Sequence, residues 1–387
     1  MNSVFPFLYP SPNEVTMPTK LNSKVRRSTV LSLVGFLLAG AASWHQAAVA
    51  QATAKPIKVT YAVATRDLNV GYPFATLPLG LGYFAEEGLD VDVVPGTSSA
   101  GTIQLLMSGR AQVGVVVTDP AVVQRAKSGL PVKSFYAISR RNGFVMVVPE
   151  GSPIRNFADL RGKKLGTSDL GSGAHVYVNV RLGQAGIPED AVTQVNVGYG
   201  APAFEALMNG KIDALATFTG ARARMEGAGY KFRQLPQAGF EDKMYSYNLY
   251  ATDQYIAANP EVIEKIGRAT AKATVFMKAN PEAAVRVFWK QYPERAPKNQ
   301  NDPKELEKDL AILKAQMYDM KADELPMEFH WGSQDREAWG ALQDYLKSAG
   351  MVATPKDVGE YFYAGQQAGY IKFDRSAVIS KAKAWKP

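Results

Sequence analysis

Cysteine is absent from this sequence of 387 residues. The chain can therefore form no disulfide bond, and it offers no cysteine for a lipid anchor. Zinc sites built on thiolates are excluded as well. The two histidines beyond residue 50, His175 and His330, lie too far apart in sequence to form a recognisable zinc motif. We therefore expect neither a metal ion nor a cofactor.

Motifs of nucleic-acid binding and of catalysis are also missing. No run of arginine and lysine with interleaved aromatic residues occurs, which argues against a nucleic-acid partner. Residues 80–85 fit a loose G-x-G-x-x-A pattern, but they follow a proline-rich loop rather than a strand, so a dinucleotide site is not indicated. No G-x-S-x-G motif is present. We therefore expect no catalytic residues and no enzyme activity.

The first fifty residues have the pattern of a signal peptide. The apolar run 30–42 follows basic residues that include Arg26 and Arg27, and it ends before the small residues 48–50. The run is shorter than the roughly 20 residues that span a bilayer. We predict a signal peptide over 1–50, cleaved before Gln51, and a mature chain in the periplasm without membrane insertion. The arginine pair leaves twin-arginine export open, and either Met1 or Met17 is the start.

Beyond residue 55, short β-branched runs alternate with longer amphipathic segments, which is typical of α/β folds with parallel sheets. The first series predicts strands over 57–63, 89–94, 111–117, 132–139 and 144–148. The second series predicts strands over 164–168, 192–197, 212–218 and 232–235, followed by an extended stretch over 244–256. Helices are predicted over 260–279, 281–292, 303–318 and 334–350, three of them with proline in the first turn.

These series predict two lobes. We expect a first lobe over 55–142, a second lobe over 143–245, and a return to the first lobe over 246–387. The chain would cross between the lobes near 140–144 and again near 241–248.

Ligands in such sheets bind beyond the carboxyl ends of the strands, where helix N-termini present free N–H groups. Arg66 follows the first strand and could pair with an anion or simply with Asp67. Hydroxyl groups and glycines stand at two predicted helix starts, where they could bind a ligand or only cap the helix. These candidates are Thr97, Ser98, Ser99 and Gly101 at the first start, and Ser168, Asp169, Ser172, Gly173 and His175 at the second. Further candidates at strand ends are Thr118, Asp119, Tyr199 and Thr219.

Five segments together resemble the sulfonate, taurine and nitrate branch of periplasmic solute-binding proteins of ABC transporters. They are PLGLGYFAEEGLDVDVV (78–94), TIQLLMSGRAQVGVV (102–116), FADLRGKKLGTSDLGSGAHVYVNVRLGQAGI (157–187), AFEALMNGKIDALATF (203–218) and LYATDQYIAANPEVIEK (249–265). The resemblance implies a two-lobed α/β protein of the type II periplasmic-binding-protein fold with two crossover segments. It adds Asn69 and Tyr72 to the ligand-binding candidates, although the loop that carries them is longer and richer in proline than is usual in the family.

By this resemblance, the protein would be a monomer that closes around a small organic anion, a sulfonate or carboxylate, and delivers it to an ABC permease and its ATPase. Candidate partners for the anion are Arg66, Arg140 and Arg141. A neutral heterocycle such as a thiamine-precursor pyrimidine is the alternative ligand. A pyrimidine-biosynthesis enzyme of the same fold is a further alternative, but its cysteine-rich motif cannot occur in this chain.

Overall fold

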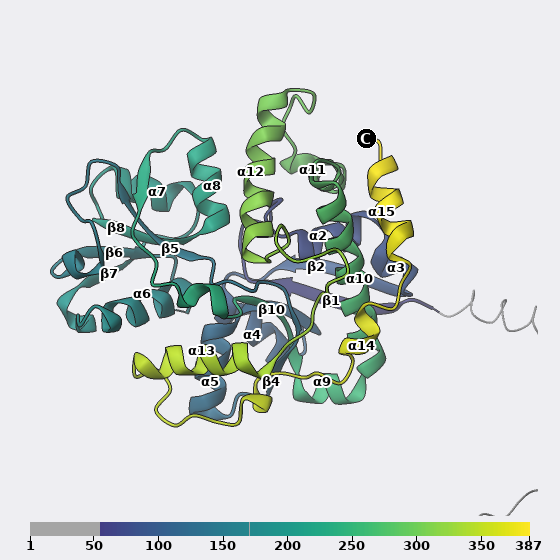
Figure 1. Ribbon diagram of the computed structural model, residues 1–387, viewed down its shortest axis with the longest axis horizontal. Coiled ribbons are helices and arrows are strands. Elements are labelled where there is room, and N and C mark those ends of the chain that lie inside the picture. Colours follow the sequence, from purple (N-terminus) through teal and green to yellow (C-terminus); the bar gives the residue numbers. More distant parts are fainter. Residues whose placement is uncertain (1–54, 170) are drawn as a thin grey trace, which may run out of the picture. The chain divides into compact units, whose positions relative to one another are not determined.

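The first five-stranded sheet combines strands from both halves of the described chain. The computed structural model describes residues 55–169 and 171–387 (Figure 1), so the predicted signal peptide lies outside the described residues. The strand order is β2-β1-β3-β10-β4. The strands are β1 (Ile57–Val63), β2 (Leu89–Pro95), β3 (Val113–Val117), β4 (Val132–Ala137) and β10 (Tyr247–Thr252). β1, β2 and β3 run parallel, whereas β10 runs antiparallel between β3 and β4. The sheet is therefore mixed, and not parallel throughout as the alternation alone predicted.

The second sheet has the order β7-β6-β8-β5-β9. Its strands are β5 (Phe144–Pro149), β6 (Lys164–Thr167), β7 (Thr193–Asn196), β8 (Ala214–Phe218) and β9 (Phe232–Gln234). β6, β7 and β8 are parallel, and β5 runs antiparallel to β8 and β9. We refer to each sheet with the helices packed on it as the first and the second lobe.

Two chain segments connect the lobes, one between β4 and β5 and one between β9 and β10. Backbone hydrogen bonds join the two segments, from Asn142 N to the Glu241 carbonyl (2.8 Å) and from Ser246 N to the Ser139 carbonyl (3.2 Å). The crossovers therefore lie side by side. This pairing makes them a short double connection about which the lobes can move.

Four helices that follow β10 begin close to where the sequence predicts them: α10 (Pro260–Ala279), α11 (Pro281–Gln291), α12 (Pro303–Asp319) and α13 (Arg336–Ser348). Three further helices follow β10, namely α9 (Asp253–Ala258), α14 (Gln367–Tyr370) and α15 (Arg375–Ala384). Proline occupies the first turn of α10, α11 and α12, where its missing N–H costs no hydrogen bond. The stretch 244–256 is not extended throughout, because the Thr252 side chain accepts a hydrogen bond from Tyr255 N and so starts α9.

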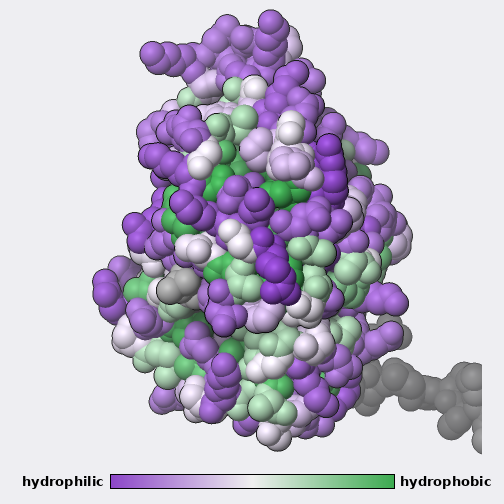
Figure 2. All heavy atoms as spheres, turned by 90° about the vertical axis from the view of Figure 1, so that its left-hand side faces the viewer, coloured by the Kyte–Doolittle hydropathy of each residue, from purple (hydrophilic) through white to green (hydrophobic). Residues whose placement is uncertain are grey.

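Helix α12 contacts both lobes. It packs against α11, which covers the first lobe, and against α8 (Thr219–Gly227) of the second lobe. Figure 1 shows α12 between these two helices. The face of the second lobe seen in Figure 2 is mainly hydrophilic, with smaller apolar areas between the polar side chains. Of the helices in the described part of the chain, none has both the length and the apolar character that crossing a bilayer requires.

Candidate functional site

The lobes enclose a cavity at the carboxyl ends of their parallel strands, which we call the inner chamber. The first lobe contributes Ala64 after β1, Ser99 at the start of α4 (Ser99–Met107), Val117 at the end of β3, and Tyr247. The second lobe provides the remaining lining residues: Phe144, Ser168, Ser172, Gly173, Ala174, Gly198, Tyr199, Gly200, Ala203, Leu215, Ala216, Thr217, Phe218 and Ala221. Strand ends and helix starts meet here because the parallel strands of a sheet all end at the same edge.

Hydrogen bonds from backbone N–H groups position Ser172 and Ser99 in the inner chamber. Ser172 precedes α6 (Gly173–Gln184), and its hydroxyl accepts a hydrogen bond from His175 N (3.3 Å) and donates one to the Asp169 carbonyl (2.6 Å). The Ser99 hydroxyl accepts from Val117 N (3.2 Å), which fixes the start of α4 against β3. These hydroxyls serve the fold first, yet both line the cavity and keep unused hydrogen-bonding capacity for a ligand.

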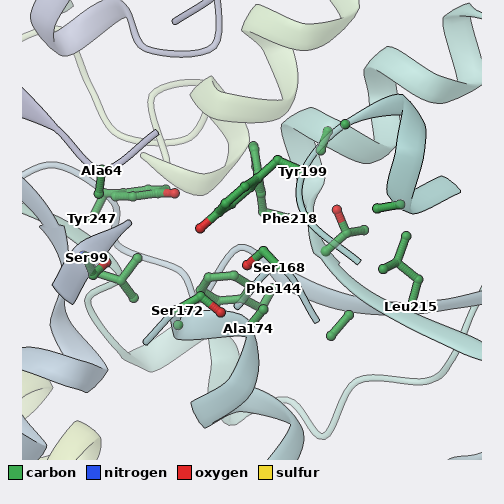
Figure 3. A pocket seen from close by; sticks show the side chains of 18 residues that line it. Ala64, Ser99, Phe144, Ser168, Ser172, Ala174, Tyr199, Leu215, Phe218 and Tyr247 are labelled. Atoms are coloured by element: carbon green, nitrogen blue, oxygen red, sulfur yellow. Dashed lines mark hydrogen bonds between the residues drawn. The ribbon is translucent and has the colours of Figure 1, made fainter. Parts of the chain in front are cut away.

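Four aromatic side chains give the inner chamber its character: Phe144, Tyr199, Phe218 and Tyr247. In Figure 3, Tyr199 and Phe218 lie next to each other, with Tyr247 on the first-lobe side and Phe144 between the serines. Phe144 is supported from behind by the ring of Tyr177, whose centroid lies 6.1 Å away. Rings in such positions can contact the faces of a flat ligand.

Tyr199 is held at both its backbone and its hydroxyl. It lies between Gly198 and Gly200, whose φ angles of 71° and 66° favour glycine. Its hydroxyl donates a hydrogen bond to the Asp169 carboxylate (2.9 Å), and Asp169 accepts a further bond from Gly171 N (2.8 Å). Burial raises the pKa of the Tyr199 hydroxyl well above its usual range, so the group is neutral at physiological pH.

A second cavity, the outer chamber, adjoins the inner chamber and shares four of its residues. The shared residues are Tyr199, Gly200, Phe218 and Ala221. Its other lining residues are Thr65, Asp67, Asn69, Tyr72, Gly220, Arg224 and Met225. Asp67 of the first lobe forms a salt bridge with Arg224 of the second lobe. Thr65, Asp67, Asn69 and Tyr72 all belong to the loop after β1, so this loop forms one wall of the outer chamber. It is the loop that is longer than is usual in the family that the sequence resembles.

Charge is distributed unequally between the chambers. Among the described residues, no charged side chain lines the inner chamber. The three arginines predicted as partners of an anion lie elsewhere. Arg66 is exposed and lines neither chamber. Arg140 donates to the Ser333 carbonyl (2.6 Å), and Arg141 forms salt bridges with Asp242 and Glu324.

The model of the family described as NMT1/THI5 like matches residues 79–284. The chain belongs to the NMT1/THI5-like family.

Three curated relatives of this NMT1/THI5-like protein carry names that refer to heterocycles. A 4-amino-5-hydroxymethyl-2-methylpyrimidine phosphate synthase of Saccharomyces cerevisiae is 25% identical over 257 residues, which are 62% of this chain and 73% of the relative. A formylaminopyrimidine-binding protein of Halalkalibacterium halodurans is 26% identical, over 74% of this chain and 84% of its own length. The riboflavin-binding protein RibY of Chloroflexus aurantiacus is 22% identical, over 73% and 78%.

Solved structures confirm the expected fold of the NMT1/THI5-like protein. The alkanesulfonate-binding protein SsuA from Xanthomonas axonopodis pv. citri, bound to MOPS, superposes with a TM-score of 0.61 at 17% identity and covers 81% of this chain and 100% of its own. The periplasmic aliphatic sulphonate binding protein SsuA from Escherichia coli gives a TM-score of 0.59, also at 17% identity, over 80% and 92%. The fold is the two-lobed type II periplasmic-binding-protein fold.

The structure of the NMT1/THI5-like protein brings some of the predicted site residues together. Ser99, Ser168, Ser172, Gly173 and Tyr199 line the inner chamber, and Asn69, Tyr72 and Tyr199 line the outer chamber. The remaining candidates line neither chamber: Arg66, Thr97, Ser98, Gly101, Thr118, Asp119, Asp169, His175 and Thr219.

Several of these remaining candidates have structural roles instead. The Ser98 hydroxyl caps α4 by accepting from Gly101 N (3.3 Å). His175 directs its ring towards Gln194 (2.8 Å) and Asn179 (3.3 Å). The Thr118 hydroxyl donates to the Tyr245 carbonyl (2.8 Å) inside the first lobe.

Sequence reasoning missed Phe144 and Tyr247 as lining residues, and for Phe218 it left open whether the ring stacks on a ligand or packs in the core. Phe144 opens β5 directly after the first crossover, and Tyr247 opens β10 directly after the second. An aromatic residue at each predicted crossover is the signal that could have identified both, because crossovers border the space between lobes.

The lobes are in close contact around the inner chamber. A Cβ atom added to Gly173 would lie 2.7 Å from both Val117 of the first lobe and Phe144. The inner and outer chambers have volumes of about 30 and 60 Å³. A cavity of roughly 150 Å³ is known to hold benzene. A ring-sized ligand therefore requires the lobes to separate, at least slightly.

Proposed function

We propose that this protein is the extracytoplasmic solute-binding component of an ABC importer and that it binds an uncharged, flat nitrogen heterocycle of the pyrimidine type. The observation that carries the proposal is the lining of the inner chamber by four aromatic rings and several hydroxyl groups without a charged side chain. A buried anion without a charged partner or a dense set of donors is strongly disfavoured. This favours a heterocycle over the sulfonate or carboxylate that the sequence suggested first.

The names of the relatives support the same ligand class. Two of the three refer to substituted pyrimidines and the third to riboflavin, which is also a flat nitrogen heterocycle. Ring nitrogens and amino groups need hydrogen-bond partners when they are buried. The hydroxyls of Ser99, Ser168, Ser172 and Thr217 line the inner chamber and can supply such partners.

The mechanism that we propose is closure of the lobes on the ligand. The second lobe provides most of the inner chamber, including Tyr199 and Phe144, and would bind the heterocycle first. Ser99 and Tyr247 of the first lobe then complete the contacts. A ligand that contacts both lobes stabilises the closed state, which a membrane permease with its ATPase can recognise. No covalent step is needed.

Binding is favoured over catalysis by two observations. The cysteine-rich motif expected of a pyrimidine-biosynthesis enzyme cannot occur, because the sequence has no cysteine. His175 is close in sequence to Ser172 and Gly173, which line the inner chamber, but its ring points towards Gln194 and Asn179. A periplasmic location is supported by the signal-peptide pattern over 1–50.

The test is isothermal titration calorimetry with the purified protein. The ligands are 4-amino-5-hydroxymethyl-2-methylpyrimidine, formylaminopyrimidine and riboflavin on one side, and taurine, an alkanesulfonate and nitrate on the other. We expect at least one heterocycle and no anion to bind. At 100 times its dissociation constant, that heterocycle should add roughly 2.7 kcal/mol to the free energy of unfolding.

Two variants test the location of binding. Tyr199→Ala removes a ring of the inner chamber and should reduce the affinity more than tenfold, whereas Arg66→Ala, which changes an exposed side chain outside both chambers, should leave it unchanged. Binding of an anion to the wild type, together with its loss in Arg66→Ala, would contradict the proposal.

A further inference from the structure

A third hollow, which we call the recess, adjoins the outer chamber. The recess is lined by Asp67, Leu68, Asn69, Val70, Arg224, Phe288, Arg295, Asp309 and Ile312. It shares Asp67, Asn69 and Arg224 with the outer chamber, and the outer chamber shares Tyr199 and Phe218 with the inner chamber. The three hollows therefore lie in a series in which neighbouring hollows share walls.

The loop that forms the outer chamber is well ordered by its own hydrogen bonds. Asp67 N donates to the Thr65 hydroxyl (3.0 Å), the Asn69 side chain donates to the Asp67 carbonyl (3.0 Å), and Gly71 N donates to the Asn69 side chain (2.9 Å). Tyr72 follows this turn and packs edge-on against Tyr247, with ring centroids 6.4 Å apart. The loop is thus an ordered wall of the outer chamber, and Tyr72 connects it to Tyr247 of the inner chamber.

The positive and negative side chains that line the recess are equal in number. Asp67 pairs with Arg224 and also with Arg295 (3.3 Å), and Asp309 accepts a hydrogen bond from Trp289 (2.7 Å). Two arginines and two aspartates are thus the charged side chains that line the recess. An anionic group placed here would compete with Asp67 for its arginines and would be repelled by both carboxylates. A hydroxyl can donate to Asp67 and accept from Arg224 without disturbing their charges.

We propose that the ligand carries a short, uncharged, hydroxylated substituent, which lies in the outer chamber while the heterocyclic ring occupies the inner chamber. The inference rests on the proposed function, because it assumes that a heterocycle binds between the lobes. The substituent passes between Tyr199 and Phe218, and its hydroxyls reach the pair formed by Asp67 and Arg224. Because this pair joins the two lobes, a substituent bound to it contributes to closure as well as to affinity.

Matched ligands test the inference with the purified protein by calorimetry. One series is lumiflavin, riboflavin and riboflavin 5′-phosphate, and the other is cytosine, cytidine and cytidine 5′-monophosphate. Each series contains the bare ring, the ring with an uncharged hydroxylated substituent, and the same compound with a phosphate. In at least one series we expect the uncharged hydroxylated member to bind at least tenfold more tightly than the bare ring, and more tightly than the phosphate.

Two arginine variants of α8 show whether the outer chamber is responsible. Arg224→Gln should reduce the preference for the hydroxylated member over the bare ring about tenfold. Arg222→Gln is the control, because Arg222 lies on the same helix but bonds to Gln234 and lines neither chamber. It should leave the preference unchanged.

The outcomes that overturn the inference are distinct from failure of the proposed function. Equal or tighter binding of the bare ring, or tightest binding of the phosphate, overturns the inference. So does binding of formylaminopyrimidine, whose substituent has no hydroxyl group, when neither series nor 4-amino-5-hydroxymethyl-2-methylpyrimidine binds, although the proposed function would then stand. If no heterocycle of any kind binds, the proposed function fails.

Discussion

Thr219 at the start of α8 donates a hydrogen bond through its hydroxyl to the carboxylate of Asp319, the last residue of α12. The same Asp319 accepts backbone bonds at its carbonyl from Arg140 N (2.8 Å) and Arg141 N (3.0 Å) of the first crossover. One residue therefore joins the second lobe, the crossover and α12. This arrangement links the position of α12 to the movement of the lobes.

Removing the Thr219 hydroxyl should favour the open form. Thr219→Val deletes the only hydrogen bond shown for the Asp319 carboxylate within the described residues, and an unsatisfied buried group costs about 1–3 kcal/mol. We expect lower stability in urea and a larger radius of gyration in small-angle X-ray scattering. Thr219→Ser keeps the hydroxyl and should behave as the wild type. If Val and Ser variants scatter alike, the bond does not control opening.

The buried carboxyl of Asp119 predicts an unusual dependence of stability on pH. Burial raises its pKa from 3.8 to about 7, and neither carboxylate oxygen has a hydrogen-bond partner in the described structure, although Tyr250 and Tyr345 lie nearby. Between pH 4 and pH 7 the folded state holds a proton that the unfolded state has lost. The contribution of this group to the free energy of unfolding is thus fully present below pH 4. It is lost as the pH rises to 7, by at most about 1.4 kcal/mol per pH unit.

The variant Asp119→Asn isolates this effect, because an amide resembles the neutral acid and does not titrate. We expect the free energy of unfolding of the variant, relative to wild type, to rise between pH 4 and pH 7. Asp357→Asn is the control of opposite sign, since hydrogen bonding to Arg336 lowers the pKa of the exposed Asp357. The substitution Asp357→Asn should lower the free energy of unfolding above pH 4 and not below. A difference between Asp119→Asn and wild type that does not vary with pH would refute the assignment.

Two glycines of α6 provide a matched test of lobe contact. Gly173→Ala places a methyl group 2.7 Å from both Val117 and Phe144, which line the inner chamber, so it narrows the space for a ligand. We expect ligand affinity to fall at least tenfold. Gly183→Ala on the same helix finds no atom closer than 3.8 Å and should stabilise the helix by roughly 0.5–1 kcal/mol with unchanged affinity. Equal affinity of both variants would show that the space around Gly173 is not occupied by the ligand.

The ring of Tyr199 should contribute more to the affinity for a heterocycle than its hydroxyl does. Tyr199→Phe loses the bond to Asp169 but keeps the aromatic face, so affinity for a heterocycle should fall less than tenfold. Tyr199→Ala loses the face and should reduce affinity by more than tenfold. Calorimetry of both variants separates the two contributions. A larger loss in the Phe variant than in the Ala variant would indicate that the hydroxyl, and not the ring, meets the ligand.

Most of the strands, the long helices and the two-lobed α/β fold class could be predicted from the sequence. Short β-branched runs became strands and proline-initiated periodic segments became α10, α11 and α12, because these patterns depend only on neighbours along the chain. The helix starts at Ser98 and Ser172 were predictable for the same reason, since a side chain caps the backbone three residues away.

Only the tertiary structure decided which strand ends meet. It brought Phe144 and Tyr247, more than a hundred residues apart in sequence, to the same cavity, and it turned His175 towards Gln194. It also left the inner chamber without charge by directing Arg140 and Arg141 to partners elsewhere. Local patterns specify which face of an element is buried, whereas the neighbours of a side chain across two lobes depend on how the sheets and crossovers pack.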